Sequence, residues 1–178
     1  MTNINSGLGG ISNPYNRTQN CSIQSNTQSG KVFNSTRPKQ VYMKTDDMLY
    51  SGGNGTGLSF YIKYADESTE DNPVVVAKGV DENGKEFEQK IAINDINPSS
   101  ASIVEMRALE AHYNVDKGGS LTSLPNGTGN MGLNDRRNFI SMFEEAIQDL
   151  QTLARYDLSQ FYKRNMAIYE NIARRFEI

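Results

Sequence analysis

The stretch from residue 74 to residue 116 constrains the fold more than any other part of the chain, because it predicts a β-hairpin that leads into a helix. Asn83-Gly84 favours a two-residue type I′ turn, since both central positions of that turn need positive φ. This turn places Val76 opposite Ile91. We therefore expect one buried face of the hairpin and a wetter opposite face. The residues of the expected buried face are Val74, Val76, Val80, Phe87, Ile91 and Ile93.

A helix is expected directly after the hairpin, over residues 99–116. Pro98 suits the first turn of a helix, and Ser102 with Glu105 has capping-box spacing, so the helix should begin between residues 98 and 103. Gly118-Gly119 should end it, because glycine adopts the left-handed conformation at little cost. The apolar residues form two stripes, so we expect burial on two sides.

Two further strands are expected to complete a small antiparallel sheet. Residues 58–64 alternate apolar and polar side chains, which is typical of a half-buried strand. Together with strands over 74–80 and 87–93 they predict a three-stranded meander. Residues 41–50 are apolar enough for one extra short strand or a helical turn.

The C-terminal part contains neither glycine nor proline from Asn134 onward, and its apolar residues keep a helical period to Phe176. We favour one continuous helix over residues 134–176. The alternative is two helices that meet near Asp157, which has capping-box spacing to Gln160. One helix of this length would extend about 65 Å, more than a small sheet can cover. Part of its apolar stripe must fold back, meet another chain or hold the N-terminal tail.

These elements predict an α+β fold with a small antiparallel sheet packed against two to three α-helices. Residues 41–178 should form one domain. Residues 1–40 are dominated by Asn, Ser, Gly, Gln and Thr and should form a flexible low-complexity tail, because they cannot bury enough apolar surface to order themselves. The alternatives are a tail that orders on a partner and a tail that an export system reads in unfolded form.

Composition argues against several functions. The net charge of -3 argues against a nucleic-acid or anionic-membrane binder. Cys21 is the only cysteine and His112 the only histidine, so we expect no disulfide, no metal site, no cofactor and no nucleophile-base pair. There is no secretory signal and no apolar run that could span a membrane. We expect a cytoplasmic protein, with export without a classical signal peptide as the alternative.

Two glycine-rich segments are candidates for binding loops. Residues 51–57 lack the sequence of a phosphate-binding loop and are expected to be a mobile loop. Residues 117–133 are longer than most loops in small domains, so they are either a binding loop or a disordered excursion. A remote alternative is an enzyme with a pocket at this loop, into which Asp116, Lys117 or His112 would point.

The C-terminal helix carries the residues that we expect to contact a partner. Aromatic and apolar centres with arginine rims are typical of protein interfaces. We therefore predict a non-enzymatic protein-interaction or assembly module that binds another protein or a second copy. The alternative is an exported or appendage-associated protein with residues 1–40 as its delivery segment. The candidate contact residues are Tyr162, Tyr169, Ile172 and Phe176, with Arg174 and Arg175 at the rim.

The order of these features resembles a set of small bacterial proteins with no assigned activity. The resemblance covers residues 74–178 and depends on the stretch NPSSASIVEMRALEAHY at 97–113. It implies an α+β domain with a β-hairpin and a helical C-terminus. It assigns no site residues.

Overall fold

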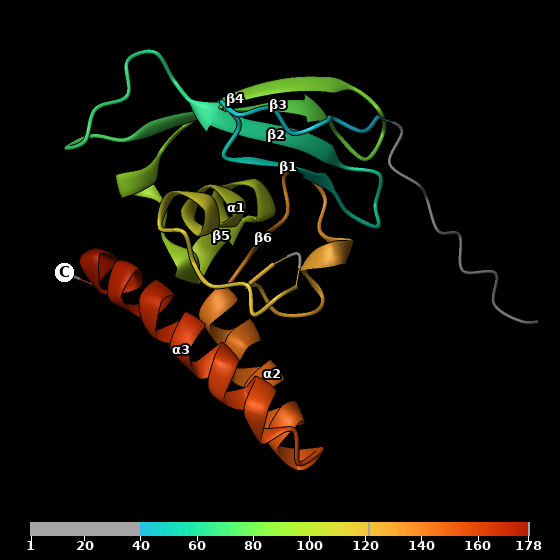
Figure 1. Cartoon of the computed structure of the whole chain (residues 1–178), viewed down its shortest axis with the longest axis vertical. Coiled ribbons are helices and arrows are strands. Elements are labelled where there is room, and N and C mark those ends of the chain that lie inside the picture. The colour runs from blue at the N-terminus through green and yellow to red at the C-terminus, as the bar shows by residue number, and fades with distance from the viewer. Residues whose placement is uncertain (1–39, 121, 178) are drawn as a thin grey trace, which may run out of the picture. The chain divides into compact units, whose positions relative to one another are not determined.

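The sheet of the protein is a four-stranded antiparallel meander in the order β1-β2-β3-β4 (Figure 1). The computed structural model describes residues 40–120 and 122–177, and these belong to one compact unit, Asn34–Ile178. The predicted N-terminal tail lies outside the described residues except for Gln40. The strands are β1 (Tyr50–Gly53), β2 (Ser59–Tyr64), β3 (Val74–Val80) and β4 (Glu86–Ala92), and a separate two-stranded pair joins β5 (Ala101–Ser102) to β6 (Arg136–Arg137).

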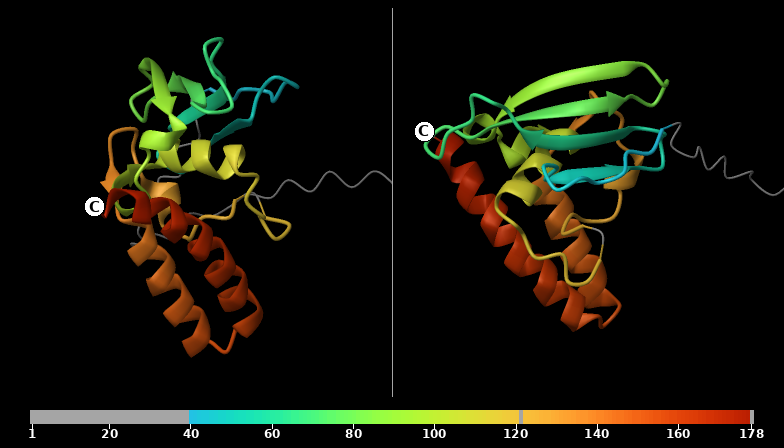
Figure 2. Two further views of the ribbon diagram at one scale, coloured as in Figure 1. Left: turned by 90° about the vertical axis from the view of Figure 1, so that its left-hand side faces the viewer. Right: turned by 45° about the horizontal axis from the view of Figure 1, so that its top comes forward.

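The predicted α+β class is confirmed. The helices are α1 (Ile103–His112), α2 (Phe139–Thr152) and α3 (Tyr156–Ala173). The sheet has one extra short strand, β1, but only Tyr50 of it belongs to residues 41–50, and the other three residues lie in the glycine-rich segment 51–57. Short 3-10 turns lie at Ile93–Asp95, Pro98–Ser100, Thr128–Asn130 and Arg174–Phe176. Two views agree that α1 lies between the sheet and the α2–α3 pair (Figures 1 and 2).

The β3–β4 hairpin closes through three residues, Glu82–Gly84, and the predicted type I′ turn was wrong. Asp81 N donates to Lys85 O at 2.8 Å, and Gly84 N donates to Asp81 O at 2.9 Å. Gly84 has φ of +81°, whereas Asn83 does not have positive φ. Asp81 Oδ1 accepts hydrogen bonds from the backbone N–H groups of Asn83 and Lys85, at 2.9 and 2.8 Å. This side-chain contact stabilises the longer turn.

The longer turn shifts the strand register by one residue. Val75 pairs with Ile91 and Gly79 with Phe87, instead of the predicted pair of Val76 with Ile91. A one-residue shift moves the side chains of one strand to the opposite face. Val74, Val76 and Val80 therefore lie on the face of β3 opposite to Val75 and Ala77. Val76 and Val80 are nevertheless buried, as expected, at 8% and 4% exposure. The core face consists of Leu58, Phe60, Ile62, Val75, Ala77 and Ile91.

The predicted start of α1 is confirmed, but its predicted end is wrong. Ser102 Oγ accepts from Glu105 N at 3.2 Å, and Glu105 Oε2 accepts from Ser102 N at 2.7 Å, which completes the capping box. The helix ends at His112, before the glycine pair. Asn114 adopts φ of +47°, and Val115 N bonds to Glu110 O at 3.0 Å. Asparagine thus supplies the left-handed residue that was expected from Gly118-Gly119.

The C-terminal segment forms two helices, so the prediction of one continuous helix was wrong and the two-helix alternative is correct. Arg155 N bonds to Leu150 O at 2.8 Å and Ala154 N bonds to Gln151 O at 3.0 Å. This is the pattern of a Schellman motif, with Ala154 as its left-handed residue at φ of +54°. The turn of Leu153–Arg155 folds α3 back along α2, which gives an antiparallel helical hairpin (Figure 2).

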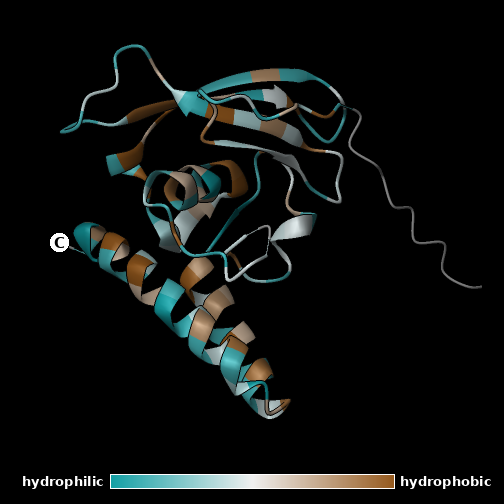
Figure 3. Ribbon diagram, viewed as in Figure 1, coloured by the Kyte–Doolittle hydropathy of each residue, from teal (hydrophilic) through white to brown (hydrophobic). Residues whose placement is uncertain are grey.

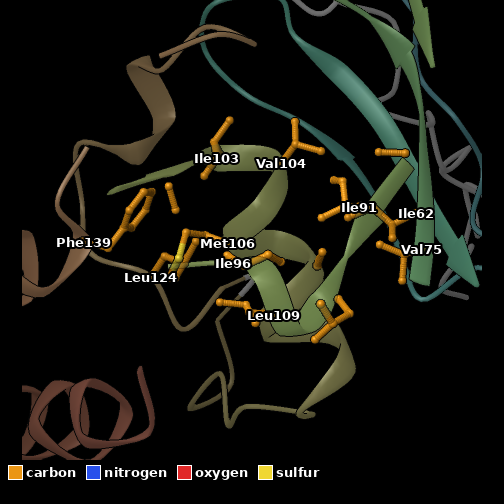
Figure 4. Close-up of a cluster of buried hydrophobic side chains, with 14 of the residues drawn as sticks. Ile62, Val75, Ile91, Ile96, Ile103, Val104, Met106, Leu109, Leu124 and Phe139 are labelled. Carbon is orange, nitrogen blue, oxygen red and sulfur yellow. The ribbon is translucent and has the colours of Figure 1, made fainter. Parts of the chain in front are cut away.

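The core is continuous from the sheet through α1 to the helical hairpin, because α1 is buried on two sides as predicted. Val104 faces the strand residues Ile62, Val75 and Ile91, while Met106 lies near Phe139 and Leu124 on the other side (Figure 4). Tyr169 and Ile172 of α3 close the core from the far side. Figure 3 shows that α2 and α3 are both amphipathic, with apolar segments along their whole length.

The left-handed alanine provides a test of the helical hairpin. We expect Ala154→Gly to raise the free energy of unfolding by about 0.5–1 kcal/mol. The left-handed conformation costs alanine about 1–2 kcal/mol, and glycine removes this cost. Part of the benefit is lost because glycine also raises the conformational entropy of the unfolded chain. The matched control is Ala167→Gly at an exposed position inside α3, which should lower it by about 1 kcal/mol. Urea denaturation measures both. A loss of stability in both variants would contradict the observed turn.

Candidate functional site

The glycine-rich loop at residues 117–133 is held against the rest of the domain over its described part. Leu124 and Met131 are buried in the core. Gly55 N donates to Gly129 O at 2.9 Å, and Asn54 Nδ2 donates to Met131 O at 2.7 Å. These contacts hold the loop in one position against the domain. They also involve Asn54 and Gly55, so they do not match the prediction that residues 51–57 form a mobile loop.

The two contacting loops contain the same tetrapeptide, Asn-Gly-Thr-Gly, at 54–57 and 126–129. In the first copy, Asn54 Oδ1 accepts from the backbone N–H and the hydroxyl of Thr56, at 3.1 and 2.6 Å. In the second copy, Gly127 has φ of +98° and Thr128 Oγ1 donates to Pro125 O at 3.1 Å. The two copies differ in backbone conformation, because positive φ occurs at the fourth residue, Gly57, of the first and at the second residue, Gly127, of the second. The repeated tetrapeptide is a feature of the sequence, but periodicity and spacing do not predict that its two copies are in contact.

A buried carboxylate, Glu110, anchors the loop to α1. Its side chain is 1% exposed. Oε2 accepts from Arg107 Nη1 at 2.8 Å, and Oε1 accepts from Thr122 Oγ1 at 2.9 Å and from Ser123 Oγ at 2.7 Å. The Ser123 backbone N–H also donates to Oε1. A buried charge costs free energy unless it is paired and hydrogen-bonded, and Glu110 meets both conditions.

The pKa of Glu110 is lowered from its ordinary value. Burial alone raises this pKa, but the charge of Arg107 and the hydrogen bonds from Ser123 and Arg107 outweigh burial. Glu110 is therefore an ionised carboxylate at neutral pH. A carboxylate with these partners is suited to holding the loop in place and not to proton transfer.

The same network reaches α3 through Tyr169. Its hydroxyl lies 3.0 Å from Ser123 Oγ, and its ring stacks on Phe143 with centroids 5.5 Å apart. Burial raises the pKa of Tyr169 far above its ordinary value. Helix α1, the loop and the helical hairpin are thus joined by one set of buried polar contacts.

A cavity of about 470 Å³ lies between the loop, α1 and strand β1. Among the described residues that line it, Arg107 alone is charged. The Arg107 side chain is 13% exposed, and its guanidinium carbon lies 5.3 Å from the ring centroid of Tyr50. The full lining is Tyr50, Ser51, Gly52, Gly53, Asn54, Arg107, Thr122, Leu124, Pro125, Asn126, Gly127, Thr128 and Gly129. We call it the Arg107 cavity.

A second hollow of about 330 Å³ lies on the other side of Asn126, where the loop meets the helical hairpin. Leu153 is 70% exposed here, and the neighbouring Tyr156 is 64% exposed. We call this hollow the hairpin groove. It is lined by Asn126, Met142, Glu145, Ala146, Asp149, Leu150, Leu153, Leu158 and Tyr162.

The structure divides the predicted contact set. Tyr162 lines the hairpin groove and is half-buried, with its ring 5.9 Å from that of Phe143. Tyr169 and Ile172 are buried in the core, so neither belongs to an exposed surface. The reason is that α3 folds back on α2 and covers the stripe that a continuous helix would have exposed.

The remaining predicted contact residues, Arg174, Arg175 and Phe176, are exposed at the C-terminal end of α3. They lie twelve or more residues beyond Tyr162, which is about 18 Å along a helix. They therefore do not share one patch with it.

The residues of the enzyme alternative are not brought together at the loop. His112 Nδ1 lies 2.9 Å from Tyr64 Oη and lines a different pocket with Ser68 and Pro73. Burial lowers the pKa of His112. Asp116 is exposed and its Oδ1 caps the backbone N–H of Gly118 at 2.9 Å.

Within residues 40–120 and 122–177, no group of three or more His, Cys, Asp or Glu side chains could hold a metal ion. None of the helices described in those ranges is long and apolar enough to cross a membrane. No protein-family model, no curated protein and no solved structure matches the chain. None of these comparisons therefore assigns a function to the chain, and the resemblance to small bacterial proteins stays a prediction.

The Arg107–Glu110 pair should be important for stability. We expect Arg107→Met to lower the free energy of unfolding by about 3–5 kcal/mol, because it leaves the Glu110 charge buried without its partner. The control is Lys90→Met, which breaks an exposed pair with Glu67 and should change stability much less, because water and salt screen that pair. Urea denaturation measures both. Equal losses would contradict the role of the buried pair.

The lowered pKa of Glu110 also predicts a pH dependence. The ionised Glu110 contributes fully to the free energy of unfolding at pH values above its pKa in the unfolded chain, about 4.3. This contribution is lost as the pH falls through the lower pKa that Glu110 has in the folded protein. The stability difference between the wild type and Glu110→Gln should therefore be constant from pH 7 to about 5 and shrink below about 4. Urea denaturation of both proteins at each pH measures this difference. A difference that grows in acid would contradict this assignment.

Proposed function

We propose that the protein is a non-enzymatic interaction module that binds an apolar, basic segment of another protein in the hairpin groove. The single observation that carries this proposal is the exposure of apolar side chains around a hollow at the end of the hairpin. A helical hairpin that only stabilised its own domain would not need Leu153 and Tyr156 at its turn. Exposed apolar side chains gathered around a hollow are typical of interaction sites.

The groove offers apolar surface on two helices. Leu150 and Leu158 are half-buried on either side of the turn, and Met142 and Tyr162 line the hollow deeper in the hairpin. Fully burying one exposed leucine is worth about 1.5–3 kcal/mol. Two or three apolar side chains of a partner can therefore supply several kilocalories per mole. This supports binding through an amphipathic segment that lays its apolar face into the groove.

The charges around the groove indicate the chemistry of the partner. Glu145 and Asp149 line it and are exposed, and neither forms an ion pair within the described part of the chain. None of the described residues that line the groove is basic. A partner segment with lysine or arginine beside its apolar residues would complement these carboxylates, and charge complementarity raises both association rate and specificity.

The whole domain has the same sign of charge. Residues 1–39 contain four basic residues, Arg17, Lys31, Arg37 and Lys39, and no Asp or Glu. Subtracting those four from the 18 lysines and arginines leaves 14, against 21 aspartates and glutamates, so residues 40–178 carry a formal charge of -7. An acidic domain favours basic partners at a distance as well as in contact.

The alternative of an exported or appendage-associated protein depends on residues 1–40 and stays a prediction. Cytoplasmic localisation and the absence of catalysis stay predictions as well. No contact among the described residues favours an exported or appendage-associated protein over the interaction module.

The experiment uses the full chain and a synthetic helical peptide of leucine and lysine in amphipathic spacing. Fluorescence anisotropy should report a Kd of roughly 1–100 μM, which corresponds to about 5.5–8 kcal/mol. Leu153→Asp should weaken binding at least about tenfold without loss of stability, because this side chain is 70% exposed. A scrambled peptide of the same composition should bind more weakly.

The matched control variant is Ile168→Asp. Like Leu153, Ile168 is an exposed apolar residue, but it belongs to α3 and does not line the groove. It should bind the peptide like the wild type. Equal loss in the two variants, or no binding at millimolar peptide, would refute the groove. A wild-type dimer in light scattering that Leu153→Asp converts to a monomer would replace the partner by a second copy of the chain.

A further inference from the structure

The Arg107 cavity lies along the outer edge of the sheet. Five consecutive residues, Tyr50–Asn54, line it. Successive side chains of a strand point to opposite faces of the sheet, so a cavity over one face would be lined by every second residue. The side chains of Tyr50 and Ser51 belong to opposite faces of the sheet, yet both residues line the cavity, which places it beside the strand. β1 is the end strand of the sheet, and no other described strand pairs with its outer edge.

The register shows which backbone groups point toward this edge. Asn54 N donates to Leu58 O at 2.9 Å, so this pair is hydrogen-bonded. Along an antiparallel ladder, hydrogen-bonded pairs alternate with pairs that are not hydrogen-bonded. The pair of Gly52 with Phe60 lies two residues from that of Asn54 with Leu58, so it is also a hydrogen-bonded pair. Ser51 and Gly53 lie between these positions. Their N–H and C=O groups are therefore directed away from β2, toward the cavity.

The two edges of the sheet differ in charge. β4, at the far edge, has the sequence EFEQKIA, in which Glu86, Glu88 and Lys90 are exposed. Exposed charges on an edge strand hinder pairing with another chain. β1 has the sequence YSGG and carries no charge. Only β1 has an edge that is suited to accept a further strand.

The opposite wall of the cavity provides room and hydrogen-bond donors. Gly52, Gly53, Gly127 and Gly129 have no side chains that could fill it, and a Cβ added at Gly129 would meet nothing within 4 Å. Among residues 40–120 and 122–177, Arg107 donates a hydrogen bond only through Nη1, to Glu110, so its other guanidinium donors are not used by these residues. Because Glu110 offsets the charge of Arg107, an uncharged acceptor fits better than an anion. A peptide carbonyl is such an acceptor.

From these observations we propose that the Arg107 cavity binds a partner segment in extended conformation, which adds to β1 as a further antiparallel or parallel strand. The backbone groups of Ser51 and Gly53 pair with the segment, and Arg107 donates to one of its carbonyl oxygens. Leu124 and Pro125 contact its apolar side chains. The four residues of β1 set the length of pairing, about 13 Å at about 3.3 Å per residue. This site is separate from the hairpin groove.

The test uses the full chain and the capped pentapeptide acetyl-Thr-Val-Thr-Val-Lys-amide. Amide chemical shifts followed by NMR should show saturable binding, with the largest changes at Ser51 and Gly53. Gly53→Pro should weaken binding at least about tenfold, because proline removes an N–H that faces the edge and leaves the β1–β2 ladder intact. Gly53 is exposed and does not have positive φ, so the sheet accommodates the ring.

The matched control is Gly53→Ala, which keeps the N–H and should bind within about threefold of the wild type. Circular dichroism should show the same thermal midpoint for both variants to within a few degrees. Two further peptides are N-methylated at alternate residues, one at the odd and one at the even positions. One of the two should lose binding and the other should keep it, because only every second N–H group of the peptide faces β1.

Three results would overturn the proposal. The first is no shift change at 10 mM peptide. The second is equal binding by Gly53→Pro and Gly53→Ala, or by both N-methylated peptides. The third is a dimer of the full chain that Gly53→Pro dissociates, which would make a second copy the occupant of the edge. A failure of the hairpin groove would affect none of these readouts.

Discussion

The buried charge of Glu110 is the interaction on which the arrangement of the site depends. Its carboxylate receives donors from α1 and from the loop after it, and Ser123 extends the contact to Tyr169 of α3. A buried carboxylate with a missing donor is costly, so these segments hold one position relative to each other. The loop at 122–129 then separates the Arg107 cavity from the hairpin groove, and Asn126 lines both.

The local sequence was enough to predict most elements of this fold. The capping box at Ser102, the alternation in β2 and the amphipathic C-terminus predicted α1, a strand and a helical segment that the structure confirms. These features succeed because they depend on side chains close in sequence. The two-sided burial of α1 followed from the same reasoning.

The errors arose where one side chain or one distant contact decides the outcome. Asp81 selects a three-residue turn, and the register of β4 shifts with it. Ala154 adopts the left-handed conformation that glycine usually takes, so the sequence contains no glycine that would predict the break between α2 and α3. The Arg107 cavity unites residues from three distant parts of the chain, which neither periodicity nor spacing can bring together.

The fixed position of the loop is the central claim, and amide hydrogen exchange tests it most directly. The backbone N–H groups of Ser123 and Gly55 donate to Glu110 and Gly129, respectively. If Glu110 holds the loop as described, both amides should exchange as slowly as those in the middle of α1. Exchange of both at the rate of an exposed loop would show that the loop is not fixed, and neither hollow would then have the described shape.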